Sequence, residues 1–382
     1  MSRRDFSKAQ LKKGPTERRC KQCVDRMCED ALCSEPTAKN RSQTKDSESE
    51  RNEDAEKNKE APTKLCSACG KSSDALKKCT ACKCVWYCDK ECQNKHRREH
   101  KKECKVIKTE LVKRGGKLDL GTELDVGPLP DLPPREECPI CLHVMPIHSM
   151  LQSYAACCGK MICSGCEFQH KMTYVEQTAE IGETSSWLTC AFCRTTLPKS
   201  DEEKVAQLSK RVELKDPIAL YNMAGNYDTG RFGLSVDQTK CLELLHQAVD
   251  LDYPDAQYTL GNFYEIGAMG LEQNEGKARK YWEKAAEGGD IDARHNLGYM
   301  ERENGNDVAA MHHWRLSASV GYGLSMKFLI EKYFENGLLR HGDLAETLQA
   351  FYRAKAEMKS DDRDEHIKHM KKKEEYEEED EH

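Results

Sequence analysis

The chain has 382 residues, of which 38% are hydrophobic and 33% are charged, and its formal net charge is −6. This length allows two or three domains, but so hydrophilic a composition cannot supply a large apolar core to each of them. The negative charge argues against a chain that binds nucleic acid throughout, and no apolar run approaches the ~20 residues needed to cross a bilayer. We therefore expect protein partners, with neither membrane nor nucleic acid among them.

Residues 1–63 are polar, mixed in charge and almost free of aromatic side chains, so we expect them to be disordered. The N-terminus lacks the apolar core of a secretory signal. Most of the 21 cysteines lie in metal-type pairs, which fits a reducing compartment. We therefore expect a cytoplasmic or nuclear protein. Within 1–63, metal binding and idle thiols both remain open for Cys20, Cys23, Cys28 and Cys33.

Four short pairs of metal-type residues fill positions 66–104. Seven thiols and one imidazole make two sets of four soft ligands, the number that a tetrahedral Zn²⁺ requires. A disulfide knot is the alternative, but the missing secretion signal argues against it. We therefore expect zinc. The pairs are Cys66 and Cys69, Cys79 and Cys82, Cys88 and Cys92, and His100 and Cys104.

These pairs, with the aromatic Trp86 and Tyr87 directly before Cys88, resemble the MYND zinc finger. The resemblance implies two interleaved zinc sites over residues 66–104. The first site would use the first and third pairs, and the second site would use the second and fourth pairs. The implied ligand sets are Cys66, Cys69, Cys88 and Cys92 for one ion, and Cys79, Cys82, His100 and Cys104 for the other.

Residues 105–134 are expected to form a linker that contains proline. Pro130, Leu132 and Pro134 match the form P-x-L-x-P, and MYND fingers of several families bind proline-rich peptides of this form. A polyproline II segment is preformed, so docking it costs little ordering entropy. Two hypotheses remain open, a linker that docks on its own finger and a stiff spacer. The resemblance also implies proline-rich peptides as partners.

A second cysteine-rich module is expected over residues 135–198, where eight thiols suffice for two tetrahedral zinc sites. Their order and spacing resemble a RING domain of the all-cysteine type. The resemblance implies Cys138, Cys141, Cys163 and Cys166 on one zinc, and Cys157, Cys158, Cys190 and Cys193 on the other. Because Cys157 and Cys158 are adjacent, His143, His148 or His170 could replace Cys157. A single zinc with idle thiols is a further alternative.

RING domains hold a ubiquitin-conjugating enzyme and its thioester-linked ubiquitin together, which is a proximity effect. They need no covalent catalytic residue. By resemblance, Ile140 would contact the conjugating enzyme and Arg194 would bridge ubiquitin and its carrier. His170 and Ala191 depart from the aromatic and the proline that are usual at their positions. A RING-type ligase and an interaction module without ligase activity therefore both remain open.

Small residues recur at a spacing of 37 between positions 213 and 357, for example Ala219, Ala256 and Ala293. The spacing shortens to 32 from Trp282 to Trp314. Such self-similarity indicates stacked helix pairs, and the two tryptophans are expected in the core. The pattern resembles Sel-one-like repeats, relatives of the tetratricopeptide repeat, which implies an all-α solenoid on whose surface as yet unknown client proteins dock.

Residues 358–382 are expected to be a charged, acidic tail, in which the run Glu374 to Glu381 forms a solvated helix extension or tail; a dock for a basic partner is the alternative. The fold expected is therefore multidomain, with a disordered N-terminus, two zinc-stabilised cross-brace modules with two zinc ions each, and a helical solenoid. The combination of RING module and repeats resembles a group of algal proteins. We expect an adaptor, as a RING-type ubiquitin ligase or as a non-catalytic scaffold in transcription or protein quality control. Methyl transfer is set aside, because neither 1–63 nor 105–134 has room for a SET domain. A chelator is expected to unfold the zinc modules and to spare the repeats.

Overall fold

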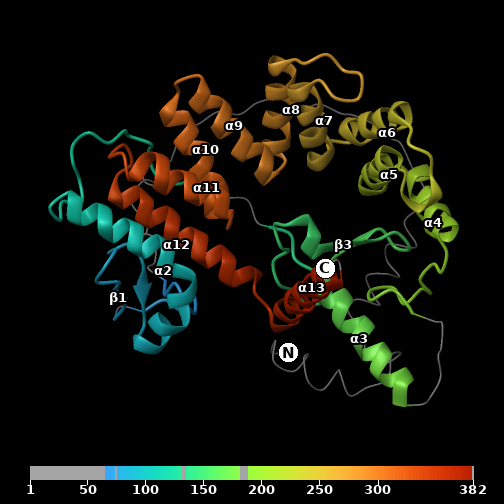
Figure 1. Cartoon of the computed structure of the whole chain (residues 1–382), viewed down its shortest axis with the longest axis horizontal. Helices are drawn as coiled ribbons and strands as arrows, with labels where there is room; N and C mark the ends of the chain where they lie inside the picture. The colour runs from blue at the N-terminus through green and yellow to red at the C-terminus, as the bar shows by residue number, and fades with distance from the viewer. Residues whose placement is uncertain (1–64, 74, 131–134, 181–187, 381–382) are drawn as a thin grey trace, which may run out of the picture. The chain divides into compact units, whose positions relative to one another are not determined.

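The computed structural model describes residues 65–73, 75–130, 135–180 and 188–380. The segment 1–63 with its four cysteines lies outside these residues, as do Leu132 and Pro134 of the proline-rich motif. Over the described part of the chain, two small cysteine-rich modules precede a series of paired helices, which confirms the expected fold class (Figure 1). In that part, no helix combines the length and the apolar character needed to span a membrane.

The first module is a short hairpin followed by a long helix. Strands β1 (Lys77–Lys78) and β2 (Trp86–Tyr87) pair antiparallel, and α2 (Lys90–Lys113) follows. Asp89 caps this helix by accepting a hydrogen bond from the Cys92 amide at 2.8 Å. The helix continues nine residues into the segment expected to be a linker. It does so because Ile107 and Leu111, one turn apart, are buried on the face that carries His100.

The second module contains a hairpin and one helix. Its elements are η1 (Ser149–Leu151), β3 (Gln152–Ala155), β4 (Lys160–Cys163) and α3 (Ser164–Glu180). Between the antiparallel strands, the amides of Cys158 and Gly159 both donate to the Ala155 carbonyl, at 3.0 and 2.8 Å. Gly159 has φ +68°, in the left-handed region that favours glycine. The core of this module is small, with Ile162 packed among three cysteines and Ala191.

The repeats begin after α4 (Asp201–Glu213). In each pair of helices the two members pack on one another, and Asp216, Asp237, Asn274 and Asp290 cap four of the helices. A turn η2 (Arg231–Gly233) lies inside the first pair. The paired helices are α5 (Pro217–Thr229) with α6 (Gln238–Asp250), α7 (Pro254–Ile266) with α8 (Glu275–Glu287), and α9 (Ile291–Glu303) with α10 (Asp307–Ser319).

The spacing of 37 residues corresponds to equivalent buried positions. Ala219, Ala256 and Ala293 each have 0% exposure, so the repeat register expected from the sequence is the packing register. Trp282 and Trp314 are 5% and 0% exposed, as expected for core residues. Their indole rings lie against glycines: a Cβ atom at Gly261 would come within 2.6 Å of Trp282, and one at Gly298 would come equally close to Trp314. Larger residues at these two glycines would displace the indoles.

The last unit is irregular. Helix α11 (Gly323–Phe328) passes into a π-helical turn, η3 (Leu329–Phe334), before α12 (His341–Met358) completes the pair. Tyr333, in the π-helical turn, is buried and donates its hydroxyl hydrogen to Asp307 at the start of α10. A π-turn shifts the face that a helix presents to its neighbours. Here it leaves an apolar surface that the first cysteine-rich module covers.

The first module and the last repeats share one hydrophobic core. This core contains Val85, Ile107 and Leu111 from the module together with Trp314 and Phe351 from the repeats. Polar contacts cross the same boundary: His341 Nε2 donates to the Cys82 carbonyl at 2.8 Å, and Gln349 donates to the Cys84 carbonyl at 3.3 Å. The first module is therefore packed into the end of the solenoid.

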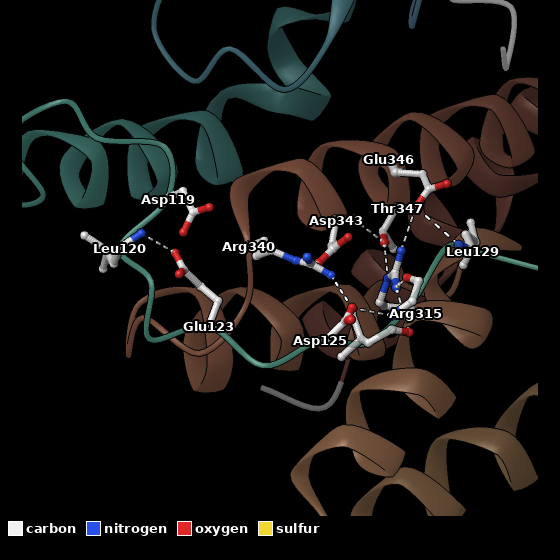
Figure 2. A network of polar contacts seen from close by, with 12 residues as sticks. Asp119, Leu120, Glu123, Asp125, Leu129, Arg315, Arg340, Asp343, Glu346 and Thr347 are labelled. Carbon is white, nitrogen blue, oxygen red and sulfur yellow. Dashed lines mark hydrogen bonds and ion pairs between the residues drawn. The ribbon is translucent and has the colours of Figure 1, made fainter.

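The segment after α2 runs along the same repeats and is held by arginines (Figure 2). Arg315, 2% exposed, donates to the Gly127 carbonyl at 2.6 Å and to Glu346 at 2.6 Å. Arg340 pairs with Asp125. The Leu124 amide donates to the Leu338 carbonyl at 2.8 Å. Residues 117–130 thus form a strap bound along the last repeats, which differs from a free spacer.

The last helix, α13 (Asp361–Asp380), packs on α3 of the second module. The segment expected to be a charged tail is therefore helical from residue 361 to 380. Phe168 on α3 lies against the rings of His366 and His369, with centroids 5.2 and 5.1 Å away. Ser164 and His366 Nδ1 are 3.0 Å apart. These contacts are made by polar and aromatic side chains. The sequence of α13 therefore lacks the apolar periodicity that would predict a packed helix.

Candidate metal centres

The sixteen residues expected to bind metal lie in four groups of four. In each group the ligand atoms are within 4.8 Å of one another. The membership of each group is the one that the resemblances implied. In both modules the first and third pairs share one group, and the second and fourth pairs share the other, so each module is cross-braced.

The first group consists of Cys66, Cys69, Cys88 and Cys92. Cys69 Sγ and Cys88 Sγ are 3.5 Å apart. The knuckle that carries the first pair is closed by the Gly70 amide, which donates to the Cys66 carbonyl at 2.8 Å. Gly70 has φ +70°, which a two-residue knuckle requires at this point.

The second group joins a knuckle to helix α2. Cys79 and Cys104 have their sulfur atoms 3.7 Å apart, and His100 Nε2 is 3.2 Å from Cys82 Sγ. His100 and Cys104 are four residues apart in a helix, so both side chains lie on one face. The His100 ring and the Cys104 thiol consequently converge with the two thiols of the knuckle, Cys79 and Cys82.

The other nitrogen of His100 has its own partner. His100 Nδ1 lies 3.2 Å from the Tyr352 hydroxyl, which in turn donates to Glu103 at 3.5 Å. With Nε2 directed at the thiols, Nδ1–H is the donor to Tyr352. Metal-bound histidines commonly use their second ring nitrogen in this way, which fixes the tautomer and the ring orientation. Tyr352, on α12 of the repeats, therefore orients a ligand of the finger.

The third group consists of Cys138, Cys141, Cys163 and Cys166. The sulfur atoms of Cys138 and Cys166 are 3.9 Å apart, and those of Cys141 and Cys163 are 3.8 Å apart. The knuckle is closed by the Leu142 amide, which donates to the Cys138 carbonyl at 2.8 Å. The other two ligands come from the end of β4 and the first turn of α3.

The fourth group includes both adjacent cysteines. Cys157 and Cys158 join Cys190 and Cys193, with Cys193 Sγ 3.4 Å from Cys157 Sγ. The glycine turn after Cys158 lets both thiols face one point. A hydrogen bond from Cys158 lowers the pKa of Cys190 to about 4 and raises that of Cys158.

The histidines considered as substitutes for Cys157 have other contacts. His143 Nδ1 lies 3.1 Å from the Cys141 carbonyl oxygen, and the His148 ring lies beside Tyr322. His170 Nε2 lies 3.0 Å from the Thr189 carbonyl oxygen. Within the described residues, none of the three belongs to a group that could hold a metal.

The donors fit zinc in chemistry and in spacing. Ligands about 2.3 Å from a tetrahedral ion lie roughly 3.8 Å from one another, and the sulfur–sulfur distances of 3.4–3.9 Å approach this value. A disulfide needs about 2.05 Å, and every cysteine of the described residues is free. Zinc would supply the cross-links that hold these small modules folded.

Arg363 of α13 reaches the third group. Its side chain is 3% exposed, and its Nη2 is 3.6 Å from Cys141 Sγ. Nη1 donates to the Val144 and Met358 carbonyls at 2.7 and 2.6 Å. Gly165 makes room for it, because a Cβ atom there would be 2.8 Å from the arginine side chain. Four thiolates around Zn²⁺ carry a net charge of −2, which a buried guanidinium partly offsets.

Two known protein families match parts of this chain. The model of the MYND finger matches residues 66–104. Residues 66–104 form a MYND finger. The model of the Sel1 repeat matches residues 217–253 and 254–290, which are the first two helix pairs. The chain therefore joins a MYND finger, whose ligand groups fit zinc, to Sel1 repeats.

Individual relatives match parts of the chain. A Caenorhabditis elegans protein named SET domain-containing protein 14 is 50% identical over 44 residues, which are 12% of this chain and 10% of that protein. A Sel1 repeat protein from Oxalobacter formigenes is 26% identical over 33% of this chain and 96% of its own, with a TM-score of 0.30. A protective antigen of uropathogenic Escherichia coli with an SLR fold is 27% identical over 37% of this chain and 31% of its own, with a TM-score of 0.34.

The two residues expected to contact a conjugating enzyme lie in different surroundings. Ile140 is half-buried and packs against the small core beside the third group. Arg194 follows the last ligand at φ +63°, and its Nη1 donates to His170 Nδ1 at 2.9 Å. His170, which stands where an aromatic residue is usual, therefore contacts Arg194.

The sequence analysis missed three residues that support the metal groups: His96, Tyr352 and Arg363. His96, buried in the first module, could have been found, because it precedes His100 by one helical turn. Burial lowers its pKa to about 4 and keeps the ring neutral beside the second group. Tyr352 and Arg363 lie 252 and 222 residues from the ligands they contact, so no local signal exists.

Proposed function

We propose that this protein is an adaptor that acts as a RING-type ubiquitin ligase in the cytosol or nucleus. The second module would recruit a ubiquitin-conjugating enzyme, and the MYND finger and repeats would gather substrate. The observation that carries the proposal is the alternating pairing of eight thiols in the second module, because it places Ile140 and Arg194 beside two cross-braced metal groups. No nucleophile is required, because such a module acts by proximity.

Each of the two residues has a distinct task in this proposal. Ile140 offers a partly exposed apolar contact from a knuckle that the third group makes rigid. Arg194 offers a planar guanidinium with several donors, which suits bridging two proteins at once. Its left-handed backbone directs the chain away from the last ligand. To bridge ubiquitin and its carrier, Arg194 would exchange its bond with His170 for new acceptors.

One observation favours a second candidate function. Because Arg194 already donates to His170, the module could be a scaffold without ligase activity, and His170 would then be a fixed partner of the arginine. In that case the zinc modules would serve in transcription or protein quality control as docking units.

A ubiquitin transfer assay separates the two functions. We expect wild type to form ubiquitin chains with at least one of a panel of conjugating enzymes, and Ile140→Ala and Arg194→Ala to lose this activity. Ile266→Ala and Arg353→Ala, at exposed positions outside the module, serve as matched controls and should retain it. Equal inactivity of all five proteins would establish the scaffold function.

We also propose that the MYND finger takes proline-rich peptides. A cleft of about 1440 Å³ has Lys83 and Trp86 of the finger and Gln349 of α12 in its lining, together with Pro128 and Pro130 of the chain itself. A P-x-L-x-P peptide would therefore compete with the strap. Changing Leu132 to Ala should raise the affinity for an added peptide of this form, measured by fluorescence anisotropy. Unchanged affinity would discard self-docking.

A further inference from the structure

The exposed face of α2 carries a stripe of cations. Steps of three and four residues along a helix bring side chains onto one face, and here each cation of the stripe except the last is followed, three or four residues later, by another lysine or arginine. All six side chains are exposed, and the stripe is about 16 Å long at 1.5 Å per residue. This basic stripe consists of Arg97, Arg98, Lys101, Lys102, Lys105 and Lys108.

The carboxylates of the same helix do not neutralise the stripe. Each is directed at another partner, and within the described part of the chain no ion pair engages any of the six cations. The recorded contacts are Glu91 with Lys95, Glu99 with Lys359, Glu103 with Tyr352, and Glu110 with Lys113 and Arg114.

The charge of this region opposes that of the whole chain. Residues 65–117 contain fifteen lysines and arginines against six acidic residues, whereas the chain as a whole carries −6. Like charges at a spacing of four residues weaken a helix, and the stripe contains three such pairs: Arg97 with Lys101, Arg98 with Lys102, and Lys101 with Lys105. Solubility does not explain why positive charge is concentrated on this helix, because a surface with both signs of charge interspersed would keep the protein equally soluble.

We propose that the basic stripe binds a short acidic segment of a partner protein. Carboxylates spaced along an extended or helical segment would meet cations that recur about every 6 Å along α2. This interaction surface is distinct from the cleft for proline-rich peptides and from the second module. It does not depend on ligase activity.

The surroundings favour an acidic peptide over nucleic acid. A helix that reads duplex DNA enters the major groove, but α2 is covered along one side, where His96, His100, Ile107 and Leu111 are buried. Single strands are held by stacking on aromatic rings, and α2 contains no Phe, Tyr or Trp. The acidic remainder of the chain would also repel a long polyanion. A short segment stays within about one Debye length, 8 Å, of the stripe.

Fluorescence anisotropy on the full-length zinc-loaded protein tests this proposal. The probe is a fluorescein-labelled 14-residue peptide with glutamates at intervals of three and four residues. The comparison peptide has glutamine in their place, and a 14-nucleotide single strand and its duplex represent nucleic acid. The variant Arg97→Gln, Lys101→Gln, Lys105→Gln, Lys108→Gln removes four of the six charges of the stripe and introduces a good helix former, so zinc content should stay unchanged.

The control variant is Lys210→Gln, Lys280→Gln, Lys284→Gln, Lys332→Gln, which changes net charge equally at exposed positions of α4 and the repeats. We expect the stripe variant to bind the glutamate peptide about tenfold or more weakly than wild type, and the control to bind within about twofold. Affinity should fall as salt rises. Three results would overturn the proposal: equal binding by the stripe variant, an equal loss in the control, or tighter binding of wild type to either nucleic acid than to the peptide.

Discussion

The MYND finger and the second cysteine-rich module both hold two metal groups in alternating order, but they are attached to the helices differently. Helix α2 of the first module runs past the finger and contributes Ile107 and Leu111 to a core that continues through Trp314 to Phe351. The second module keeps a small core of its own around Ile162. It is joined to the helices by polar contacts, such as that from Tyr154 to Asp216 at 2.7 Å, and by two partly buried side chains, Tyr154 and Ala156, that pack against the core of α4 and α5.

This difference shows that a metal site can stabilise regions far from its ligands. Where two regions share an apolar core, the folding energy supplied by zinc in one also supports the other. Where hydrogen bonds and two partly buried side chains join them, disruption should remain more local, because a typical hydrogen bond contributes only about 0.5–1.5 kcal/mol net. We therefore expect a chelator to loosen the last repeats together with the modules.

The largest effect should come from losing a ligand in each module. Cys82→Ser removes a buried ligand of the finger, and Cys163→Ser removes a buried ligand of the second module. Structural zinc contributes roughly 10–16 kcal/mol of apparent folding energy. Hydrogen exchange should therefore show loss of protection in residues 66–111 and in α10 to α12 for Cys82→Ser. For Cys163→Ser the loss should be limited to the second module and α13. Unchanged protection in α10 to α12 would refute the coupling.

A smaller effect is expected from a matched pair of core substitutions. Ile107→Ala in the first module, on α2 just beyond the finger, and Ile162→Ala in the second module remove the same atoms at positions 0% and 2% exposed. Each should lower the stability of its own region by about 2–5 kcal/mol. Only Ile107→Ala should also lower the melting temperature of the repeats, followed by circular dichroism. An equal shift for Ile162→Ala would mean that the two modules are coupled alike.

Arg363→Gln tests the contact between α13 and the third group. Removing the guanidinium leaves the thiolates of Cys141 and its neighbours less compensated, and changes of this kind cost about 10- to 100-fold in metal affinity. Zinc release to a chromogenic chelator should therefore be faster for one ion per chain. Arg353→Gln, on an exposed part of α12, is the control and should release zinc as wild type does. Arg363→Lys should restore only part of the effect, because an ammonium lacks the forked donors.

The smallest effect is expected for Tyr352→Phe. This change removes only the hydroxyl that accepts from His100 and leaves the ring in the shared core. Zinc release from the second group should accelerate by about tenfold or less, with no change in the other three. Tyr322→Phe removes a hydroxyl that donates to Asp292 in the repeats and should leave zinc release unaltered. If the two variants behaved alike, Tyr352 would have no orienting role.

The sequence allowed the metal groups to be anticipated because closely spaced ligands carry their own geometry. A pair such as Cys79 and Cys82, or His100 and Cys104 on one helix face, can reach a common point whatever the rest of the chain does. The repeat register was equally accessible, since Ala219 and its equivalents recur wherever helices approach closely. Both signals are local or periodic.

The attachment of the modules had no such signal. The strap 117–130 mixes buried and exposed apolar residues, with Val126 at 7% and Leu118 at 41% exposure, and the buried Arg315 of the distant helix α10 holds the carbonyl groups of Val126 and Gly127, so the sequence of the strap does not reveal that it is bound. The segment that forms helix α13 was expected to be a tail because it is highly charged. Its packing contacts run through Arg363 and His366, and residues of these types usually face solvent. Long-range polar contacts depend on the tertiary arrangement and leave no period in the sequence.

The shared core also has a consequence for synthesis. The chain is made from its N-terminus, and 252 residues separate His100 from Tyr352. At about 5–20 residues per second, a ribosome needs roughly 10–50 s to cover that distance. Throughout this interval the nascent finger can already hold zinc while Ile107 and Leu111 lack their cover. The earliest-made domain is therefore among the last to finish folding, and it is a natural client for chaperones at the ribosome exit.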